Sequence, residues 1–364
     1  SVSRGLGDVY KRQKFYGGFI MTKGCKYGTH RVIEPKGVLT QAAYKIDNNM
    51  DIYSNEILVD VQALNIDSAS FTQIEKEAEG DSYKIAEKIM SIVNERGKMQ
   101  NPVTGSGGMF IGTVSKIGED LKDIDLKVGD RIASLVSLSL TPLKIEKILN
   151  IKKDIDRVEV KAQAILFESA IYAKLPSDMS ENLALAALDV AGAPAQTAKL
   201  VRPGQSVLIL GAAGKSGMLC CYEAMKRVGP TGKVIAMVRK DSQAKELKDW
   251  KLCHETIISD ATVPMDVLNK TLAANGGKEV DISISCVNIP NTEMSCILPV
   301  KDEGIVYFFS MATSFTKAAL GAEGIGKDVT MIVGNGYTKD HAAITLEELR
   351  ESETLRNIFQ NRYI

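Results

Sequence analysis

The stretch at residues 206–228, SVLILGAAGKSGMLCCYEAMKRV, decides the fold of this chain. It begins with a short apolar run at 206–210 that is typical of a buried parallel strand. Gly211, Gly214 and Gly217 follow at once in a G-x-x-G-x-x-G turn. After the turn, apolar residues recur at the spacing of one helix face, at Met218, Cys221, Tyr222, Met225 and Val228. The order of strand, glycine turn and helix predicts a dinucleotide-binding unit.

The glycine turn meets the requirements of a pyrophosphate site. Glycines let the backbone turn sharply and let a phosphate approach the helix N-terminus, where unpaired N–H groups and the helix dipole hold an anion. A tight connection without a ligand is the alternative, but it does not require three glycines at this spacing. An ATPase motif is excluded, because Ile209 stands where a Walker A sequence needs glycine. The residues expected to bind the cofactor phosphates are Gly211, Ala212, Ala213, Gly214, Lys215, Ser216 and Gly217.

Four further strands are expected at 233–238, 255–258, 280–286 and 304–309, with helical patterns between them. This alternation predicts an α/β fold of the Rossmann type, a doubly wound parallel sheet with helices on both faces.

The strand at 233–238, the second of the Rossmann sheet after 206–210, is followed by Arg239 and Lys240, where an NAD-selective enzyme usually has Asp or Glu for the ribose hydroxyls. The two cations favour the 2′-phosphate of NADP, although solvated surface charges would give the same sequence. The expected cofactor is therefore NAD or NADP.

Ligands of parallel sheets bind at the carboxyl ends of the strands, which selects a second group of cofactor contacts. These nicotinamide contacts are expected at Cys286, Val287, Ser310 and Met311. Cys286 has apolar neighbours and no base placed beside it, so we interpret it as packing against the cofactor rather than as a nucleophile.

The composition is that of an ordinary protein of about two domains, with 364 residues of which 45% are hydrophobic. The 45 basic residues balance the 45 acidic residues, so no net field attracts nucleic acid or a membrane surface. No apolar run reaches the roughly 18 to 20 residues that span a bilayer. The six cysteines include no C-x-x-C pair, which argues against a disulfide framework or structural zinc and favours the reducing cytoplasm.

The N-terminal residues are expected to be foreign to the protein. SVSRGLGDVYKRQ, at 1–13, resembles sequence read from an adapter at the end of a translated fragment. We therefore expect residues 1–20 to be a non-native leader and Met21 to be the natural start. The segment lacks the apolar core of a signal peptide.

The N-terminal half predicts a strand-rich domain, with an alternating strand at 56–64 and a polar helix at 83–96. Two motifs follow, GTVSKIG at 112–118 and LKVGDRI at 126–132. They resemble the GroES-like catalytic domain of the medium-chain dehydrogenase/reductase superfamily. The resemblance implies a GroES-like domain over 21–175 that is completed by 335–364, and a Rossmann domain over 176–334. It also implies a homo-oligomer, a dimer, because the superfamily commonly pairs Rossmann domains edge to edge.

The zinc-dependent members of that superfamily carry a ligand cysteine after the strand that ends near Leu64 and a Gly-His-Glu before Gly112. This chain has NIDS at 65–68 and GSG at 105–107 in those places. The chain has only three histidines in total, so no catalytic zinc is expected.

Five separated motifs resemble a narrower family, that of the L-erythro-3,5-diaminohexanoate dehydrogenases. The motifs lie at 23–32, 188–195, 211–217, 306–313 and 327–337. The resemblance implies oxidative deamination of a small diamino acid, L-erythro-3,5-diaminohexanoate, to 5-amino-3-oxohexanoate and ammonia during bacterial lysine fermentation. It also implies hydride transfer to NAD, whereas Arg239 and Lys240 favour NADP. The expected cofactor therefore stays NAD or NADP.

This chemistry needs a base twice, once to deprotonate the 3-ammonium and once to activate water. Asp67 is the leading candidate, with Ser68 beside it as a hydrogen-bonding partner; the alternative is that Asp67 only caps a turn. Glu293 is a candidate partner for an ammonium, or a residue that only favours a helix N-terminus. His30, Arg31 and Tyr337 are candidates for the substrate carboxylate, which the sequence does not place.

Two rival functions remain open at this stage. One is a zinc-independent quinone or enoyl reductase on the same fold. The other is a nucleotide-binding protein without turnover, because the fold alone does not decide function.

Overall fold

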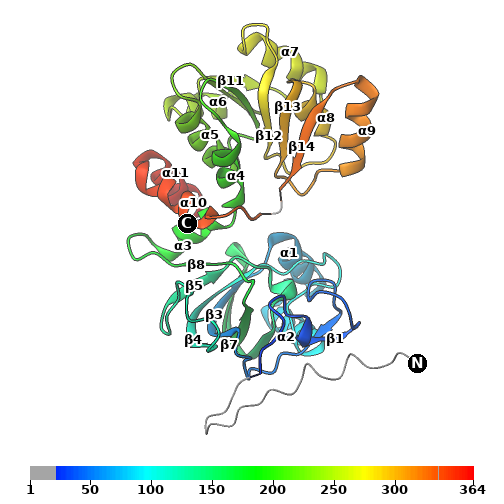
Figure 1. Cartoon of the computed structure of the whole chain (residues 1–364), viewed down its shortest axis with the longest axis vertical. Coiled ribbons are helices and arrows are strands. Elements are labelled where there is room, and N and C mark those ends of the chain that lie inside the picture. The colour runs from blue at the N-terminus through cyan, green and yellow to red at the C-terminus, as the bar shows by residue number, and fades with distance from the viewer. Residues whose placement is uncertain (1–21, 335) are drawn as a thin grey trace, which may run out of the picture. The chain divides into compact units, whose positions relative to one another are not determined.

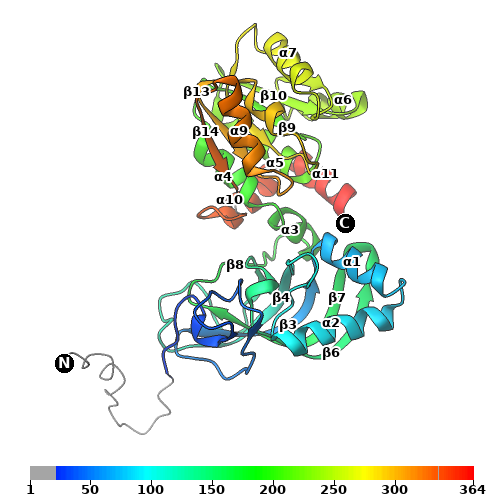
Figure 2. The same ribbon diagram turned by 90° about the vertical axis from the view of Figure 1, so that its right-hand side faces the viewer.

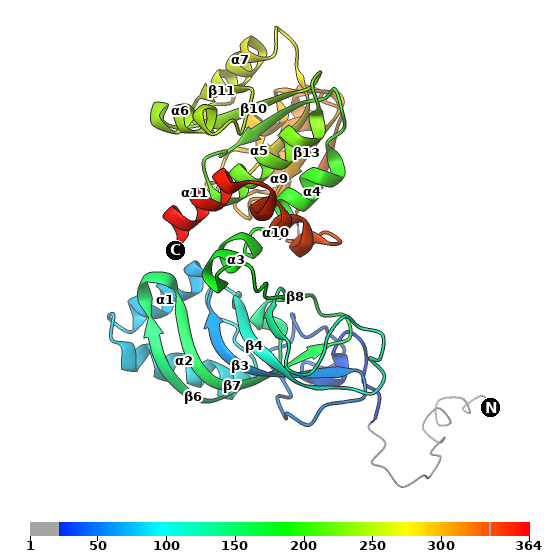
Figure 3. The same ribbon diagram turned by 90° about the vertical axis from the view of Figure 1, so that its left-hand side faces the viewer.

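A computed structural model describes residues 22–334 and 336–364, so the expected leader at 1–20 lies outside the described residues. The described residues divide into two compact units, with the boundary between Lys174 and Leu175. Figures 1, 2 and 3 show the strand-rich first unit and the α/β second unit from three directions.

The first unit contains a six-stranded antiparallel sheet in the order β6-β7-β3-β4-β5-β8. Its central strand β3 alternates as the sequence predicts, with Val59 and Val61 buried and Asp60 and Gln62 exposed. The six strands are β3 Glu56–Asn65, β4 Met109–Ile117, β5 Arg131–Ser134, β6 Leu143–Lys152, β7 Arg157–Phe167 and β8 Tyr172–Lys174.

The helices of the first unit are α1 Ser68–Glu77 and α2 Ser82–Arg96. Helix α2 follows its N-cap Asp81 and is terminated by its C-cap Gly97, which has φ 74°. A Cβ on Gly97 would lie 2.0 Å from the Ile46 carbonyl oxygen, so only glycine fits there. The apolar side chains of α2, Ile85, Ile89, Ile92 and Val93, are buried in the core of the first unit. The remaining elements are the pair β1 Val32–Glu34 and β2 Lys45–Ile46 and the 3₁₀ turns Thr29–Arg31, Leu138–Leu140 and Lys153–Ile155.

The second unit contains a six-stranded parallel sheet in the order β11-β10-β9-β12-β13-β14. This is the Rossmann order, with the reversal between β9 and β12, and it confirms the predicted fold class. The strands are β9 Ser206–Leu210, β10 Lys233–Val238, β11 Glu255–Ile258, β12 Val280–Ser285, β13 Val300–Phe308 and β14 Val329–Val333.

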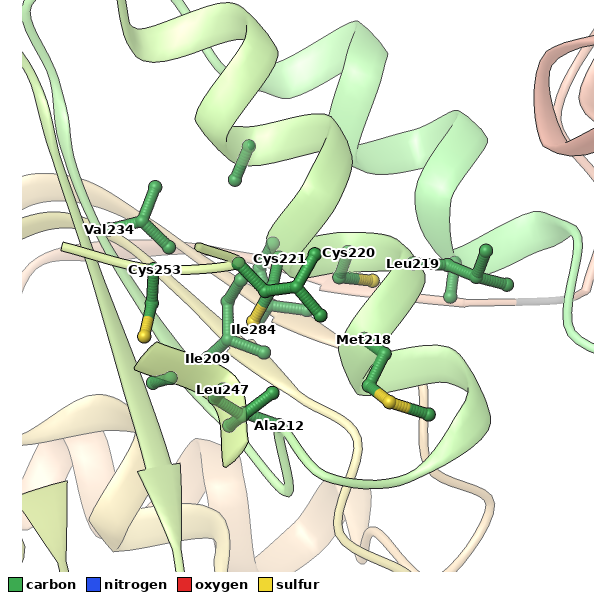
Figure 4. Close-up of a cluster of buried hydrophobic side chains, with 14 of the residues drawn as sticks. Ile209, Ala212, Met218, Leu219, Cys220, Cys221, Val234, Leu247, Cys253 and Ile284 are labelled. Atoms are coloured by element: carbon green, nitrogen blue, oxygen red, sulfur yellow. The ribbon is translucent and has the colours of Figure 1, made fainter. Parts of the chain in front are cut away.

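Strand β9 is buried on both faces because its apolar residues face two separate cores. Val207 and Ile209 join a cluster with α5 Lys215–Val228, whereas Leu208 and Leu210 join a cluster on the opposite face. Figure 4 shows the first cluster, with Ile209 and Ile284 from the sheet among side chains from α5. The remaining helices are α3 Glu181–Leu188, α4 Gly192–Leu200, α6 Asp241–Asp249, α7 Pro264–Ala274, α8 Glu293–Ile297 and α9 Phe315–Ile325.

The C-terminal helices α10 His341–Glu351 and α11 Glu353–Tyr363 belong to the second unit. Both contact α3, and α10 also contacts α4 and α5 (Figure 3). Leu349 and Phe359 from these helices are buried in the same core as β9. The structure therefore differs from the expectation that 335–364 completes the first domain, because the described part, 336–364, buries its apolar side chains against the Rossmann helices.

Within the described residues, no helix is both long enough and apolar enough to cross a membrane.

Candidate functional site

The glycine turn after β9 is fixed between the two neighbouring strands. The N–H groups of Gly211 and Ala212 donate to the Met237 carbonyl at 3.2 and 3.1 Å. Gly211 has φ 76°, and a Cβ there would lie 2.9 Å from the Cys286 carbonyl oxygen. A Cβ on Gly217 would lie 2.2 Å from the Gly211 carbonyl oxygen, so α5 packs directly on the turn. These two glycines are required by the fold itself.

Gly214 has a different environment from the other two glycines. It is exposed, and a Cβ there would meet only the Gly211 carbonyl oxygen, at 3.6 Å. It is the N-cap of α5, and no side chain caps that helix. No described group accepts a hydrogen bond from the first N–H groups of α5, which lie at the positive end of the helix dipole, and this fits the pyrophosphate of a dinucleotide.

The other residues of the turn have local partners. Lys215 Nζ pairs with Asp189 at 3.0 Å and lies 5.5 Å from the centre of the Tyr363 ring. Ala212 is buried, while Ala213 and Ser216 are partly exposed.

Arg239 and Lys240 are both exposed after the end of β10, as a ribose phosphate would require. Arg239 has an acidic neighbour, Asp260. Two hydrogen bonds from Thr262 are the main cause of the lowered pKa of Asp260, and the positive charge of Arg239 lowers it further.

The expected nicotinamide contacts gather at the carboxyl ends of β9, β12 and β13. Cys286 N–H donates to the Leu210 carbonyl at 2.9 Å, and Ser310 N–H donates to the Ser285 carbonyl at 3.2 Å. A Val287 methyl would lie 3.1 Å from a Cβ on Gly211. Met311 is 88% exposed. The Cys286 Sγ is 4.0 Å from the Cys220 Sγ and packs against an apolar cluster.

Ser285 is a residue of this edge that the sequence analysis missed. It ends β12, is fully buried, and its Oγ has no hydrogen-bond partner among the described residues. A serine inside the apolar run VDISIS was the signal available in the sequence. An orphan hydroxyl beside the glycine turn provides a further polar group for a ligand.

Glu293 is buried at the first position of α8, and its Oε1 accepts the Ser314 N–H at 2.7 Å. It therefore anchors the end of the loop that carries Ser310 and Met311. One carboxylate oxygen of Glu293 is therefore already hydrogen-bonded to a backbone N–H.

Asp67 in the first unit is the N-cap of α1, and its Oδ1 accepts the Ser70 N–H at 3.0 Å. Its other oxygen, Oδ2, is buried without a partner among the described residues. Ser68 is exposed, and its Oγ donates to Asp156 Oδ2 at 2.5 Å rather than to Asp67. Asp67 thus caps the helix, as the alternative interpretation states, and keeps one oxygen for another donor.

His30 and Arg31 are occupied by Glu56. Arg31 is buried and donates from Nε and Nη2 to the two Glu56 oxygens, both at 2.7 Å. Cys25 N–H donates to His30 Nδ1, so the Nε2–H of His30 donates to Glu56 at 2.9 Å. Burial raises the pKa of Glu56, but the hydrogen bonds from Arg31 and His30 outweigh it, and the pKa lies below its ordinary value. These residues hold the N-terminal segment rather than a substrate carboxylate.

Tyr337 in the second unit packs edge-to-face on His341 with ring centres 5.1 Å apart. The loop at 105–107 contributes Ser106, whose Oγ is 2.8 Å from the Oγ of Ser70. In the part of the chain that the structure describes, no three His, Cys, Asp or Glu side chains are grouped to hold a metal ion.

Comparison with solved structures shows the fold. The CurK enoyl reductase is 15% identical, with 94% of this chain and 85% of that chain covered and a TM-score of 0.51. The alcohol dehydrogenase TADH from Thermus sp. ATN1 is 17% identical, with 86% and 88% covered and a TM-score of 0.51. At these identities the likeness concerns the fold alone.

Comparison of sequences is far more specific. A family model described as the L-erythro-3,5-diaminohexanoate dehydrogenase N-terminal domain matches residues 30–176. The L-erythro-3,5-diaminohexanoate dehydrogenase of Acetoanaerobium sticklandii is 71% identical over 343 residues, 94% of this chain and 100% of that protein. The enzyme of the same name from Fusobacterium nucleatum subsp. nucleatum is 72% identical over 345 residues, again 94% and 100%. The chain therefore belongs to the L-erythro-3,5-diaminohexanoate dehydrogenase family.

Proposed function

We propose that this chain oxidatively deaminates L-erythro-3,5-diaminohexanoate to 5-amino-3-oxohexanoate and ammonia, with NAD or NADP as the hydride acceptor. The observation that carries this proposal is the identity of 71% and 72%, over 94% of the chain, to two enzymes that bear that name. The open helix N-terminus at Gly214 supports the nucleotide part of the proposal.

The reaction has a fixed balance. The substrate ammonium and one water enter, and the C3–H leaves as a hydride. The products are the ketone, an ammonium ion, a proton and the reduced nucleotide. A bound NAD(P)⁺ supplies the electrophile that accepts the hydride. The chain must supply anion binding, proton transfer and positioning.

Each of these tasks has a candidate residue. The N–H groups at the start of α5 hold the pyrophosphate. Asp67 Oδ2, which is buried and without a partner among the described residues, takes the proton that the 3-ammonium must lose before hydride transfer. The same carboxylate then accepts a proton from the water that attacks the iminium, after it has passed the first proton on.

Two of the candidates act through other residues. Glu293 binds the Ser314 N–H and so fixes the loop of Ser310 and Met311, which we assign to the nicotinamide. Ser68 donates to Asp156 and so ties the start of α1 to the segment before β7.

The nucleotide preference follows from Arg239 and Lys240 if they bind a 2′-phosphate. Both side chains are exposed after β10. Arg239→Ala should then lower kcat/KM for NADP while leaving kcat/KM for NAD unchanged. Equal losses for both nucleotides would remove this assignment.

The experiment that tests the function is an assay of the purified protein on L-erythro-3,5-diaminohexanoate with NAD and NADP in parallel. We expect reduced nucleotide and ammonia to appear together. Turnover of quinones or enoyl thioesters without amine oxidation would favour the reductase alternative. Nucleotide binding without turnover of any substrate would favour a non-catalytic role.

The assembly and location expected from the sequence, a homodimer in the cytoplasm, complete this proposal. Light scattering on the eluted protein measures the first, and fractionation of the producing cell measures the second.

A further inference from the structure

Two buried acceptor oxygens lack a hydrogen-bond partner in the same short segment of the first unit. They are Asn65 Oδ1 and Asp67 Oδ2. Buried polar atoms are nearly always hydrogen-bonded, because losing water without gaining a partner is unfavourable. Two orphan acceptors within three residues are therefore open to a donor from outside the described chain, such as a water molecule or a ligand.

The backbone directs both side chains to the same side. Asn65 is the last residue of β3, and Asp67 has extended dihedral angles, φ −61° and ψ 144°. Ile66 between them is 3% exposed and belongs to the core of the first unit. Side chains at i and i+2 of an extended segment project to one face, opposite the residue between them. Asn65 and Asp67 thus face away from the core together.

The segment is held firmly. Ile66 N–H donates to the Asp156 carbonyl at 3.0 Å, and Asp67 Oδ1 is fixed by the Ser70 N–H. Gly108 packs against the same backbone, where a Cβ would lie 2.0 Å from the Asn65 carbonyl oxygen. The two orphan oxygens are therefore presented in a fixed geometry, as a binding site requires.

The chemistry of the pair selects its ligand. One oxygen is an amide acceptor and the other belongs to a carboxylate, so together they suit a cation with several N–H donors. Asp67 repels a carboxylate or phosphate, although Arg157, opposite Asn65 in the register of β3 and β7, brings a positive charge to the same end of the strand. Two oxygens alone are too few for a metal ion, and no suitable group of His, Cys, Asp and Glu surrounds them within the described residues. A primary ammonium, with three N–H donors, fits both acceptors at once.

We propose that Asn65 and Asp67 bind the 3-ammonium of the diamino acid as one unit. This inference rests on the proposed function and adds Asn65 to its substrate contacts. Asn65 Oδ1 accepts one N–H and orients the group. Asp67 Oδ2 accepts a second N–H and takes that proton, so that the N–H bond breaks, an O–H bond forms and the amine becomes neutral.

The test compares two ligands and three proteins by calorimetry in the presence of reduced nucleotide. The ligands are L-erythro-3,5-diaminohexanoate and 5-aminohexanoate, which lacks the 3-amino group. The proteins are the wild type, Asn65→Leu and the control Gln62→Leu, which removes an exposed amide from the same strand. We expect Asn65→Leu to weaken binding of the diamino acid at least tenfold and to leave 5-aminohexanoate binding unchanged. The control should match the wild type for both ligands.

Equal weakening of both ligands, or no weakening, would overturn the inference. If Asn65→Leu does not fold, Asn65→Asp decides the question. A second carboxylate beside Asp67 raises the pKa of the pair, so the acid limb of the kcat/KM profile should move to higher pH; an unmoved limb overturns the inference. A wild type that never oxidises the diamino acid contradicts the proposed function, whereas an active wild type with a normal Asn65→Leu variant contradicts only this inference.

Discussion

Replacing Gly214 by alanine should separate nucleotide binding from folding. Gly214 is exposed and has φ −83° and ψ 170°, a conformation open to any residue. Alanine is a poorer N-cap than glycine by about 0.5 to 1 kcal/mol. The reduced freedom of the unfolded chain offsets this by about 0.4 to 1 kcal/mol. We therefore expect the free energy of unfolding to change by less than about 1 kcal/mol.

The same methyl group stands where a pyrophosphate would approach the first N–H groups of α5. Loss of one hydrogen bond to a charged group costs about 1.5 to 3 kcal/mol. This loss corresponds to nucleotide binding that is about 10- to 150-fold weaker. Calorimetric titration with NADH and NADPH measures the Kd, and thermal unfolding measures the stability.

Two other glycines of the same unit provide controls. Gly324 in α9 has no atom within 4 Å of its Cβ position, so Gly324→Ala should leave the Kd unchanged. Gly217→Ala places a Cβ 2.2 Å from the Gly211 carbonyl oxygen and should lower stability by about 1 to 3 kcal/mol, because the backbone must move. An unchanged Kd in Gly214→Ala would refute the placement of the phosphates at this turn.

Three further predictions concern buried charges, each measured by urea unfolding. Burial lowers the pKa of Lys98 to about 8 from 10.5, so the unfolded state binds this proton more tightly than the folded state. The free energy of unfolding should therefore rise by about 3 kcal/mol between pH 8 and 10.5. Lys98→Met should remove this rise, and an unaltered pH dependence in the variant contradicts the prediction. Burial, followed by the neighbouring Glu223, raises the pKa of Glu348 well above 4.5. Glu348→Gln should therefore gain stability relative to the wild type as the pH rises above 4.5. Parallel plots of unfolding free energy against pH for the two proteins argue against this prediction. Glu56→Gln leaves the buried Arg31 with only the half-exposed Asp47 carboxylate, 3.5 Å away, as a counter-charge and should cost about 3 to 5 kcal/mol. A loss below about 1 kcal/mol would show that the pair of Arg31 and Glu56 is unimportant.

The Rossmann unit was predictable because its signals are local. The apolar run of β9, the three glycines and the helical spacing of α5 are contiguous, and each favours the same structure. The alternation of β9 between two cores explains why its sequence is a continuous apolar run.

The unit against which the C-terminal helices pack was not predictable in the same way. Their apolar faces, which include Leu349 and Phe359, would suit either unit. Only the tertiary structure decides that they are buried beside α3 and α5. A periodic apolar pattern indicates that one helix face is buried, but it does not indicate which element that face packs against.

The roles of single polar residues depend on partners that are distant in sequence. Nothing local to Arg31 indicates that Glu56 receives two of its N–H groups, and nothing local to Glu293 indicates the Ser314 N–H. The orphan oxygen of Asn65 likewise becomes visible only when neighbouring hydrogen bonds are known. Sequence alone therefore identified Asp67 as a candidate and missed the residue two positions before it.

The most direct measurement follows a deuterium atom. L-erythro-3,5-diaminohexanoate deuterated at C3 is turned over with NAD(P)⁺, and the reduced nucleotide is analysed by mass spectrometry. Hydride transfer from the amine-bearing carbon predicts one deuterium in each reduced nucleotide and one ammonia released for each. Reduced nucleotide without deuterium, or deuterated nucleotide without ammonia, would contradict oxidative deamination at C3.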